Sequence, residues 1–596
     1  MPTPALRLAA LRQTMKQRGL AGWIIPSADP HLSEYLPEHW QTRSWLSGFT
    51  GSAGTLVVSA DEAALWADSR YWEQAEQQLA GSGIALEKLG LGGSSIEWLV
   101  NKLPQGAVVG VAPDMLSLLA KRQLESAFAE KKLVLQHQED LVDAFWLDRP
   151  TLPQGKIYIH PAEYTAQNAA EKLAAIRAVM QKKQADYHLI SSLDDIAWIT
   201  NLRGNDVSYN PVFLSHLLID AQQAVLFVDE SKLDNSTCQW LADAGISTAD
   251  YQTLNDAVGR IHGTLLISPA KVAVSSLQCL SEKVKLIEDS NPSTLFKAEK
   301  SPAEIEWVRQ AMREDGIALC GFFAEFEQKL ADGVAVNELD VSDMLIEHRS
   351  RRAGYVSPSF GTIAGFNANG ALPHYSATPE AYSEITGDGL LLIDSGAQYF
   401  GGTTDITRVT PIGTPTAAQK RDFTLVLKAH IALARAVFPE NLPAPLLDTV
   451  CRMPLWQSQL EYGHGTGHGV GYFLNVHEGP QSISYRTNPT PETAMKVGMI
   501  TSNEPGLYRP GQWGIRIENL VACQAVEQPA ETAFGKFLHF ETLTLCPIDT
   551  RLVEPALLNA EETEWLNRYH ASVHEKLEAH TEGAAKAWLI ERTQAI

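Results

Sequence analysis

Apolar residues recur at helical spacing in two stretches of the second half of the chain. The first stretch begins with Ser301-Pro302-Ala303-Glu304, which has the serine, proline and glutamate typical of a capped helix start. It ends at the stop signal Asp332-Gly333, and its apolar positions are Ile305, Val308, Met312, Leu319 and Phe323. The apolar positions of the second stretch are Trp565, Leu566, Tyr569, Val573 and Leu577. We therefore predict a long helix after Ser301 and an amphipathic helix near the carboxyl end.

A shorter pattern of helix and strand occurs twice in the first half of the chain. Residues 11–49 and 176–204 each contain a helical stretch, a short apolar strand and a segment that begins with tryptophan. Two copies favour a duplicated domain, because solenoid arrays usually need at least about three repeats. The proline-bearing stretch 148–155 separates the copies. We predict a mixed α/β (α+β) protein with three domains, at residues 1–152, 153–298 and 299–596.

The composition of the 596-residue chain excludes several classes of protein. With 48 Lys and Arg against 70 Asp and Glu, the formal charge is 48 − 70 = −22, which opposes the phosphate contacts of nucleic-acid binding. No stretch approaches the roughly 20 apolar residues of a membrane-spanning helix. The six cysteines are scattered without a CxxC pair, and the amino terminus lacks the apolar core of a secretory signal. We expect a cytoplasmic protein with reduced thiols and no nucleic-acid or membrane partner.

Two aspartates occur in a pattern of adjacent strands. We predict a buried strand at 390–394, a glycine-containing connection at 395–402 and a returning strand at 403–409. This arrangement would place Asp394 beside Asp405. Buried carboxylates are costly unless they are paired, protonated or bound to cations. The alternative is that one aspartate caps a turn and the other forms an ordinary salt bridge.

Three histidines surround a glycine run at residues 463–471. The alternating glycines exclude a stable helix, because each costs roughly 1 kcal/mol relative to alanine in a helix. They permit close backbone approach instead, which suits a tight pocket lined by His464, His468 and His477. The alternative is that these histidines are ordinary residues of the core.

Glu504 and the stretch 514–519 form a third polar cluster. If 514–519 is a strand, Arg516 and Glu518 share one face, because side chains alternate along a strand. An ordinary surface pair of arginine and glutamate remains the alternative for this cluster alone.

Together the clusters supply four carboxylates and one imidazole: Asp394, Asp405, His468, Glu504 and Glu518. Two divalent cations would neutralise the four negative charges of such a set. Oxygen-rich coordination with one nitrogen suits manganese and tolerates cobalt or zinc. Two such ions together can promote hydrolysis, so the residue types predict metal-assisted hydrolysis.

The ordered ligand series, with the motifs HGTGHGVG, SNEPG and GIRIEN around it, resembles the pita-bread metallopeptidases. That family includes methionine aminopeptidase, prolidase and aminopeptidase P, and the chain resembles the three-domain, cytosolic aminopeptidase P type along nearly its whole length. Further matching motifs are RSWLSGFTGSAGTLVV, LDDIAWITNLRGNDVSYNPVF and FETLTLCPIDT. The resemblance implies two creatinase-like α/β domains followed by a pita-bread catalytic domain with a helical extension.

The resemblance also implies how two manganese ions would be held around a shared hydroxide. Asp394 would be a bidentate ligand of one ion, His468 and Glu504 would hold the other, and Asp405 and Glu518 would bridge the pair. Glu504 would additionally act as a base.

Other residues acquire roles only through the resemblance. His374 would lie near the scissile carbonyl, and His477 would stabilise the oxyanion or assist the leaving nitrogen. His464 would line a proline pocket, and Arg516 would orient the bridging carboxylates. Relatives also suggest a homodimer.

The expected activity is removal of the first residue from peptides with proline in the second position. A proline nitrogen has no N–H to donate, so a groove that relies on strand pairing would lose a contact there. Prolidase, which has the same ligands but accepts only dipeptides, is the nearest alternative. A pita-bread module that binds peptides without cleaving them is a more distant one.

Overall fold

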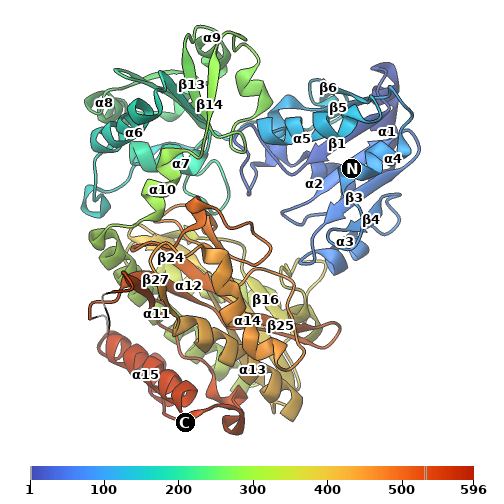
Figure 1. Cartoon of the computed structure of the whole chain (residues 1–596). Coiled ribbons are helices and arrows are strands. Elements are labelled where there is room, and N and C mark those ends of the chain that lie inside the picture. The colour runs from blue at the N-terminus through green and yellow to red at the C-terminus, as the bar shows by residue number, and fades with distance from the viewer. Residues whose placement is uncertain (1–2, 529–530, 532) are drawn as a thin grey trace. The chain divides into compact units, whose positions relative to one another are not determined.

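The structure is a computed structural model that describes residues 3–528, 531 and 533–596 (Figure 1). It separates into two compact units. Unit 1 comprises Met1–His160 and Gln167–Ser293, and unit 2 comprises Pro161–Ala166 and Thr294–Ile596. Both units combine helices with sheets, so the predicted mixed α/β class is confirmed.

Unit 1 contains two six-stranded sheets. The first is built from β1 (Gly22–Pro26), β2 (Thr55–Ser59), β3 (Ala63–Ala67), β4 (Ala85–Lys88), β5 (Val108–Val111) and β6 (Val134–His137). The second is built from β8 (Tyr187–Ile190), β10 (Ser215–Asp220), β11 (Ala224–Val228), β12 (Ile246–Asp250), β13 (Thr264–Ile267) and β14 (Lys285–Glu288). A small pair, β7 (Tyr158–Ile159) and β9 (Leu202–Arg203), lies outside both sheets.

The two sheets have the same topology. Their orders are β4-β3-β2-β1-β5-β6 and β12-β11-β10-β8-β13-β14. The strand β1 pairs antiparallel with β2 and parallel with β5, and β8 pairs in the same senses with β10 and β13. The duplication predicted from the sequence is therefore confirmed.

Helices cover these sheets with their apolar faces. In the first half they are α1 (Pro4–Gln17), α2 (Thr42–Ser47), α3 (Trp72–Gln78), α4 (Ser95–Lys102) and α5 (Leu118–Ala129). In the second half they are α6 (Ala169–Lys183), α7 (Leu193–Thr200), α8 (Asn235–Asp243) and α9 (Leu254–Val258). Leu11 and Met15 of α1 are buried, as are Ile176 and Met180 of α6, which are the matching positions of the repeated pattern. The two copies thus bury equivalent faces.

The helices of unit 2 follow α10 (Pro292–Ala298). They are α11 (Pro302–Ala331), α12 (Glu338–Ser350), α13 (Ala417–Ala434), α14 (Asp448–Trp456), α15 (Ala560–Leu577) and α16 (Gly583–Arg592). At the start of α11 the Ser301 amide donates to Glu304 Oε2 at 2.8 Å, and the Glu304 amide donates to Ser301 Oγ at 3.3 Å. Both predicted helices, α11 and α15, are confirmed.

The described strands of unit 2 form four sheets. The smaller sheets are β15 (Tyr355–Pro358), β18 (Ala397–Tyr399) and β19 (Gly402–Thr403); β16 (Ile363–Phe366), β17 (Gly389–Ser395) and β20 (Ile406–Ile412); and the hairpin β25 (Gly506–Arg509) and β26 (Trp513–Arg516). The largest has β21 (Val437–Pro439), β28 (Phe537–Thr542), β27 (Asn519–Ala525), β24 (Ile500–Asn503), β22 (Gly467–Gly469) and β23 (Glu478–Ile483), in that order. The helix α12 packs on β16, and α13 packs on β24 and β26.

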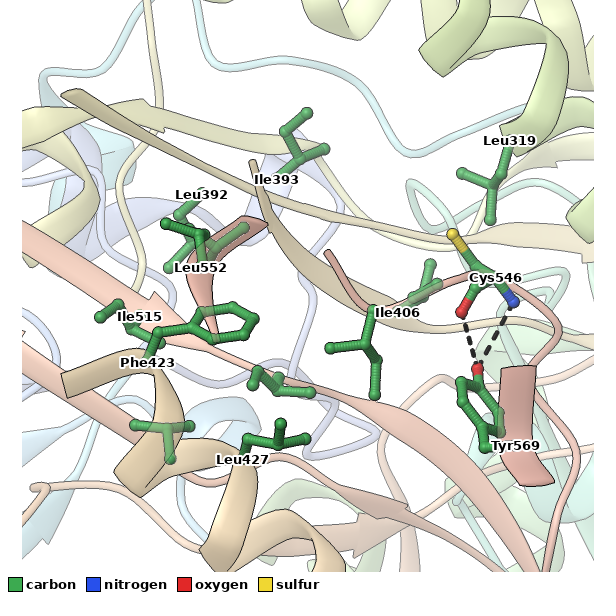
Figure 2. Close-up of a cluster of buried hydrophobic side chains, with 14 of the residues drawn as sticks. Leu319, Leu392, Ile393, Ile406, Phe423, Leu427, Ile515, Cys546, Leu552 and Tyr569 are labelled. Carbon is green, nitrogen blue, oxygen red and sulfur yellow. Dashed lines mark hydrogen bonds between the residues drawn. The ribbon is translucent and has the colours of Figure 1, made fainter. Parts of the chain in front are cut away.

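One large hydrophobic cluster forms the core of unit 2. Figure 2 shows Leu392 of β17, Ile406 of β20 and Phe423 of α13 within it. At its edge the Tyr569 hydroxyl of α15 donates to the Cys546 carbonyl oxygen at 2.8 Å. Strand and helix side chains thus share one core, which fixes the strands that carry the polar clusters.

A short segment from the first half of the chain belongs to unit 2. Within Pro161–Ala166, the Tyr164 ring lies 6.1 Å from that of Trp307 and 6.2 Å from that of Phe400, measured between centroids. The Tyr472 hydroxyl donates to the Tyr164 carbonyl at 3.0 Å. The chain therefore enters unit 2, returns to unit 1 and enters unit 2 again.

Within the part of the chain that the structure describes, no helix is both long and apolar enough to cross a membrane. All six cysteines are described, and none forms a disulfide. Cys238 and Cys279 are exposed, whereas the other four are buried.

Candidate metal centre

The two predicted aspartate ligands lie on one strand and directly before its neighbour. Asp394 is in β17, and Asp405 directly precedes β20, which pairs antiparallel with β17. The sequence prediction of a plain connection before a strand at 403 is wrong. Residues Gly402 and Thr403 pair with β18 instead, so the chain turns once more and the returning strand begins at Ile406. Asp394 and Asp405 are both buried, with 8% and 4% of their surface exposed.

The glycine-rich stretch forms no helix, as predicted, and carries His468 on the short strand β22. A Cβ at Gly467 would lie 2.0 Å from the Ser502 carbonyl oxygen, so glycine is required for this approach of β22 to β24. The Nδ1 of His468 lies 3.0 Å from the Gly469 carbonyl oxygen. Donation of an Nδ1 proton to this carbonyl leaves the lone pair on Nε2, the arrangement typical of metal-binding histidines.

The glutamates lie at the ends of strands. Glu504 follows β24, and Glu518 lies between β26 and β27. The predicted continuous strand at 514–519 is wrong, because β26 ends at Arg516 and the Glu518 amide donates to the Thr407 carbonyl of a different sheet. Thr407 nevertheless links the side chains of Arg516 and Glu518. Its Oγ1 accepts from Arg516 Nε at 3.1 Å and donates to Glu518 Oε2 at 2.7 Å.

The structure brings these side chains together. Ligand atoms of Asp405, His468 and Glu518 all lie within 4.8 Å of one another. The Nε2 of His468 is 3.5 Å from Asp405 Oδ2 and 3.5 Å from Glu504 Oε1. The Oδ2 of Asp394 accepts from Arg516 Nη2 at 2.6 Å. The buried Oδ1 of Asp394 has no hydrogen-bond partner among the described residues, so one carboxylate oxygen has its coordination capacity unused.

The electrostatics of the cluster favour bound cations. Burial and then repulsion from neighbouring carboxylates raise the pKa of Asp405 and of Glu518 well above the usual values. Burial also raises the pKa of Glu504 to about 7. Such groups can all ionise at neutral pH only if positive charge is added, which divalent cations supply. The donor set and the unused oxygen of Asp394 therefore fit metal ions that prefer oxygen and imidazole ligands.

Three further predicted histidines surround this cluster. The His477 and His468 rings meet edge to face, with centroids 4.3 Å apart. The Nδ1 of His464 lies 3.9 Å from Glu504 Oε2. His374 follows Pro373, whose carbonyl oxygen accepts from Arg516 Nη2 at 3.4 Å. Each of the three histidines thus lies close to a residue of the acidic cluster, or follows a residue that contacts Arg516 beside it.

Sequence reasoning missed Tyr508 and Thr407. The Tyr508 hydroxyl accepts from Arg516 Nη1 at 2.6 Å and bonds to His464 Nε2 at 2.8 Å. A usable signal existed for Tyr508, because the dipeptide Pro510-Gly511 predicts a turn. In the resulting hairpin, Tyr508 pairs with Gly514 and so shares a face with Arg516. Thr407 has no comparable signal in the sequence.

Comparisons with known proteins cover nearly the whole chain. Residues 306–525 match the sequence model of metallopeptidase family M24, and residues 536–596 match that of the C-terminal region of peptidase M24. Residues 7–143 and 148–304 each match a model of the creatinase/prolidase N-terminal domain.

Full-length relatives carry the same kind of name. Aminopeptidase P2 of Arabidopsis thaliana is 40% identical over 99% of this chain and 88% of its own length. Probable Xaa-Pro aminopeptidase P of Paracoccidioides brasiliensis (strain Pb03) is 38% identical over 99% of both chains. The crystal structure of X-prolyl aminopeptidase from Caenorhabditis elegans, described as a cytosolic enzyme with a di-nuclear active site, matches with a TM-score of 0.95. It is 32% identical and covers 100% of both chains.

Proposed function

This chain belongs to the M24 metallopeptidase family, and we propose that it is an Xaa-Pro aminopeptidase. It hydrolyses the first peptide bond of peptides that have proline in the second position. The observation that carries this proposal is the cluster of the buried Asp405 and Glu518 with the half-buried His468, in a chain similar along its whole length to an X-prolyl aminopeptidase. A catalytically inactive binding module would have no need for this cluster of buried, mutually repelling acids.

We assign two divalent cations to this site. Asp394, Asp405, His468, Glu504 and Glu518 would hold them, and their four carboxylates balance the four positive charges. Manganese is the metal we propose, because the donors are mostly oxygen and include one imidazole. When bound, such ions lower the pKa of a coordinated water and polarise the scissile carbonyl.

The protein's own residues would position the substrate and move protons. The buried Glu504 carboxylate would act as the base that takes up a proton. His374 would contact the scissile carbonyl, and His477 would stabilise the oxyanion or donate to the leaving nitrogen. His464, held by Tyr508, would line the proline pocket. Arg516 donates to Asp394 and Thr407, and through these contacts it would orient the bridging carboxylates.

Substrate length separates this proposal from prolidase. Purified protein should be offered an Xaa-Pro-Pro tripeptide and an Xaa-Pro dipeptide at equal concentrations. We expect faster cleavage of the tripeptide, with release of the free first residue measured by mass spectrometry. A preference for the dipeptide would show that the chain is a prolidase.

Metal dependence tests the site itself. Dialysis against a chelator should abolish hydrolysis, and added Mn²⁺ should restore it. Metal analysis of the active protein should give about two ions per chain, as the ligand set requires. Undiminished activity of metal-free protein would rule out this site as the catalytic centre.

We further propose a cytoplasmic homodimer. The unpaired state of all six cysteines supports a reducing compartment. An apolar stripe on and beside α14 supports self-association, because Leu446, Val450 and Met453 recur at helical spacing and are 49%, 39% and 50% exposed. Light scattering after size-exclusion chromatography should give a dimer for the wild type and a monomer for Met453→Glu. A monomeric wild type would exclude the homodimer.

A further inference from the structure

A buried carboxylate lies beneath the segment that carries His374. Glu338 is the first residue of α12, and only 1% of its surface is exposed. Its Oε1 accepts from the Phe366 amide at 2.7 Å, and its Oε2 accepts from the Ser383 amide at 2.7 Å and the Tyr375 hydroxyl at 2.8 Å. The side-chain nitrogen of Asn369 lies 3.0 Å from both oxygens. Four donors therefore use essentially the full acceptor capacity of one carboxylate.

All four donors belong to residues 366–383, the segment that contains His374. Its two ends are held together at Glu338, because Phe366 and Ser383 bind opposite oxygens of the same group. The backbone supports this closure, since the Glu338 amide donates to the Ser383 carbonyl at 3.2 Å. The position of Glu338 at the amino terminus of α12 also favours a negative charge there. The segment is thus a closed loop around one buried charge.

The closed loop also contacts the proposed metal site. The Pro373 carbonyl, one residue before His374, accepts from Arg516 Nη2, and the same nitrogen donates to Asp394. On the other side of His374, Tyr375 packs against the core of unit 2 and donates to Glu338. The chain at His374 is therefore held on both sides, by the contact of Pro373 with Arg516 and by the contact of Tyr375 with Glu338.

We propose that Glu338 is a positioning residue for His374, which it fixes against the reacting carbonyl by closing the segment 366–383. This inference rests on the proposed aminopeptidase function, in which His374 contacts the scissile carbonyl. The hydrogen bonds described for the Glu338 side chain all go to residues 366–383, and none goes to a proposed metal ligand. Its contribution is to keep one catalytic side chain at the correct distance, and errors of about 1 Å in such a distance can cost on the order of 100-fold in rate.

The arrangement requires a carboxylate rather than an amide. In Glu338→Gln, one carboxylate oxygen becomes an NH₂ group of similar size. In one orientation that group faces the Phe366 amide, and in the other it faces the Ser383 amide, so two donors oppose each other in both cases. The loop would therefore open at one end, although the side-chain volume is unchanged.

Kinetics on an Xaa-Pro-Pro tripeptide test the proposal with the metal-loaded protein. We expect Glu338→Gln to lower kcat on the order of 100-fold and to change KM less than about threefold, with metal content unchanged. The matched control is Glu541→Gln, which alters a carboxylate that accepts from Arg309 and Gln524 elsewhere in unit 2. A kcat for Glu338→Gln equal to that of this control would overturn the proposal.

A milder pair of variants covers the case in which Glu338→Gln fails to fold. Tyr375→Phe removes one of the four donors, and we expect it to lower kcat about three- to tenfold. Tyr382→Phe makes the same chemical change at an exposed position of the same segment and should leave kcat unchanged. Equal kcat values for these two variants would contradict the proposal.

Two further measurements separate positioning from a general structural role. In a His374→Ala background, Glu338→Gln should lower the residual kcat less than about threefold, because the residue it positions is gone. An undiminished effect there would mean that Glu338 acts independently of His374. Hydrogen exchange should be faster at 366–383 in Glu338→Gln and unchanged in α15; unchanged exchange at 366–383 would overturn the proposal. This last result stands even if the wild type cleaves no Xaa-Pro bond, an outcome that would refute only the proposed function.

Discussion

Buried histidines such as His188 make the stability of unit 1 depend on pH. His188 is fully buried, its Nδ1 lies 3.0 Å from the Leu266 carbonyl oxygen, and its Nε2 has no hydrogen-bond partner among the described residues. Burial lowers the pKa of His188 to about 4, whereas the unfolded chain has a value near 6.5. Between these values the unfolded state binds more protons, so the free energy of unfolding falls as the pH falls from about 6.5 to 4.

We expect His188→Asn to remove this part of the pH dependence, because the asparagine amide can donate to Leu266 but does not titrate. The contribution of His188 to the loss of stability at pH 4 relative to pH 7, about 3 kcal/mol, should be absent from the variant. Urea denaturation of both proteins across this pH range measures it. Parallel pH profiles would show that His188 does not titrate on unfolding.

The proposed catalytic roles of Glu504 and His477 can be tested by replacing each side chain. Replacing either by alanine should lower kcat at least about 100-fold, because a proton-transfer group is lost, while circular dichroism stays unchanged. The exposed Glu561 provides a control, and its replacement by alanine should leave kcat near the wild-type value. Near-normal turnover of either site variant would show that its role has been misassigned.

At the scale of elements, the glycines of the histidine motif are not equivalent. A Cβ at Gly467 would lie 2.0 Å from the Ser502 carbonyl oxygen, whereas one at Gly465 would lie 3.3 Å from the Ser484 Cβ. Gly467→Ala should therefore force β22 away from β24, destabilise unit 2 by about 1–3 kcal/mol and weaken metal binding. Gly465→Ala is the matched control and should have a much smaller effect. Thermal unfolding and metal titration measure both, and equal behaviour of the two variants would contradict this explanation.

Elements defined by neighbouring residues could be predicted from the sequence. The helix α11 is such a case, since its capping box, its apolar spacing and its stop signal all lie within 301–333. The interruption after Arg516 could not be predicted, because Glu518 is drawn to Thr407, which lies 111 residues earlier. The extra turn at Gly402 likewise depends on pairing with β18. Local periodicity contains no information about such distant partners.

The candidate site also has features that the sequence predicts and features that depend on distant residues. Its ligand residue types and their order could be read from the sequence, since each stands in a distinctive motif. The role of Glu338 as the shared acceptor of four hydrogen bonds could not be predicted. A glutamate at the start of a helix is usually a surface residue that interacts favourably with the helix dipole. Only the fold shows that four donors from 366–383 converge on it.

At the scale of the whole molecule, the two units should unfold separately. Each has hydrophobic clusters of its own, and the proposed metal ligands all belong to unit 2. We expect calorimetry of metal-free protein to show two transitions, of which added Mn²⁺ raises only one. At a free metal concentration of 100 Kd, each bound ion contributes about 2.7 kcal/mol to this gain. A single transition, or an equal shift of both, would contradict independent units.

The domain limits predicted at 152/153 and 298/299 remain predictions. A fragment cut at 298/299 would separate Pro161–Ala166 from the rest of unit 2. A fragment that starts at residue 299 would leave out Tyr164 and so lose the contacts of its ring with Trp307 and Phe400. The missing piece is six residues long, yet it is encoded more than 130 positions upstream. A fragment that preserves the packing of unit 2 must therefore include Pro161–Ala166, and any exchange of the second α/β domain must leave that segment in place.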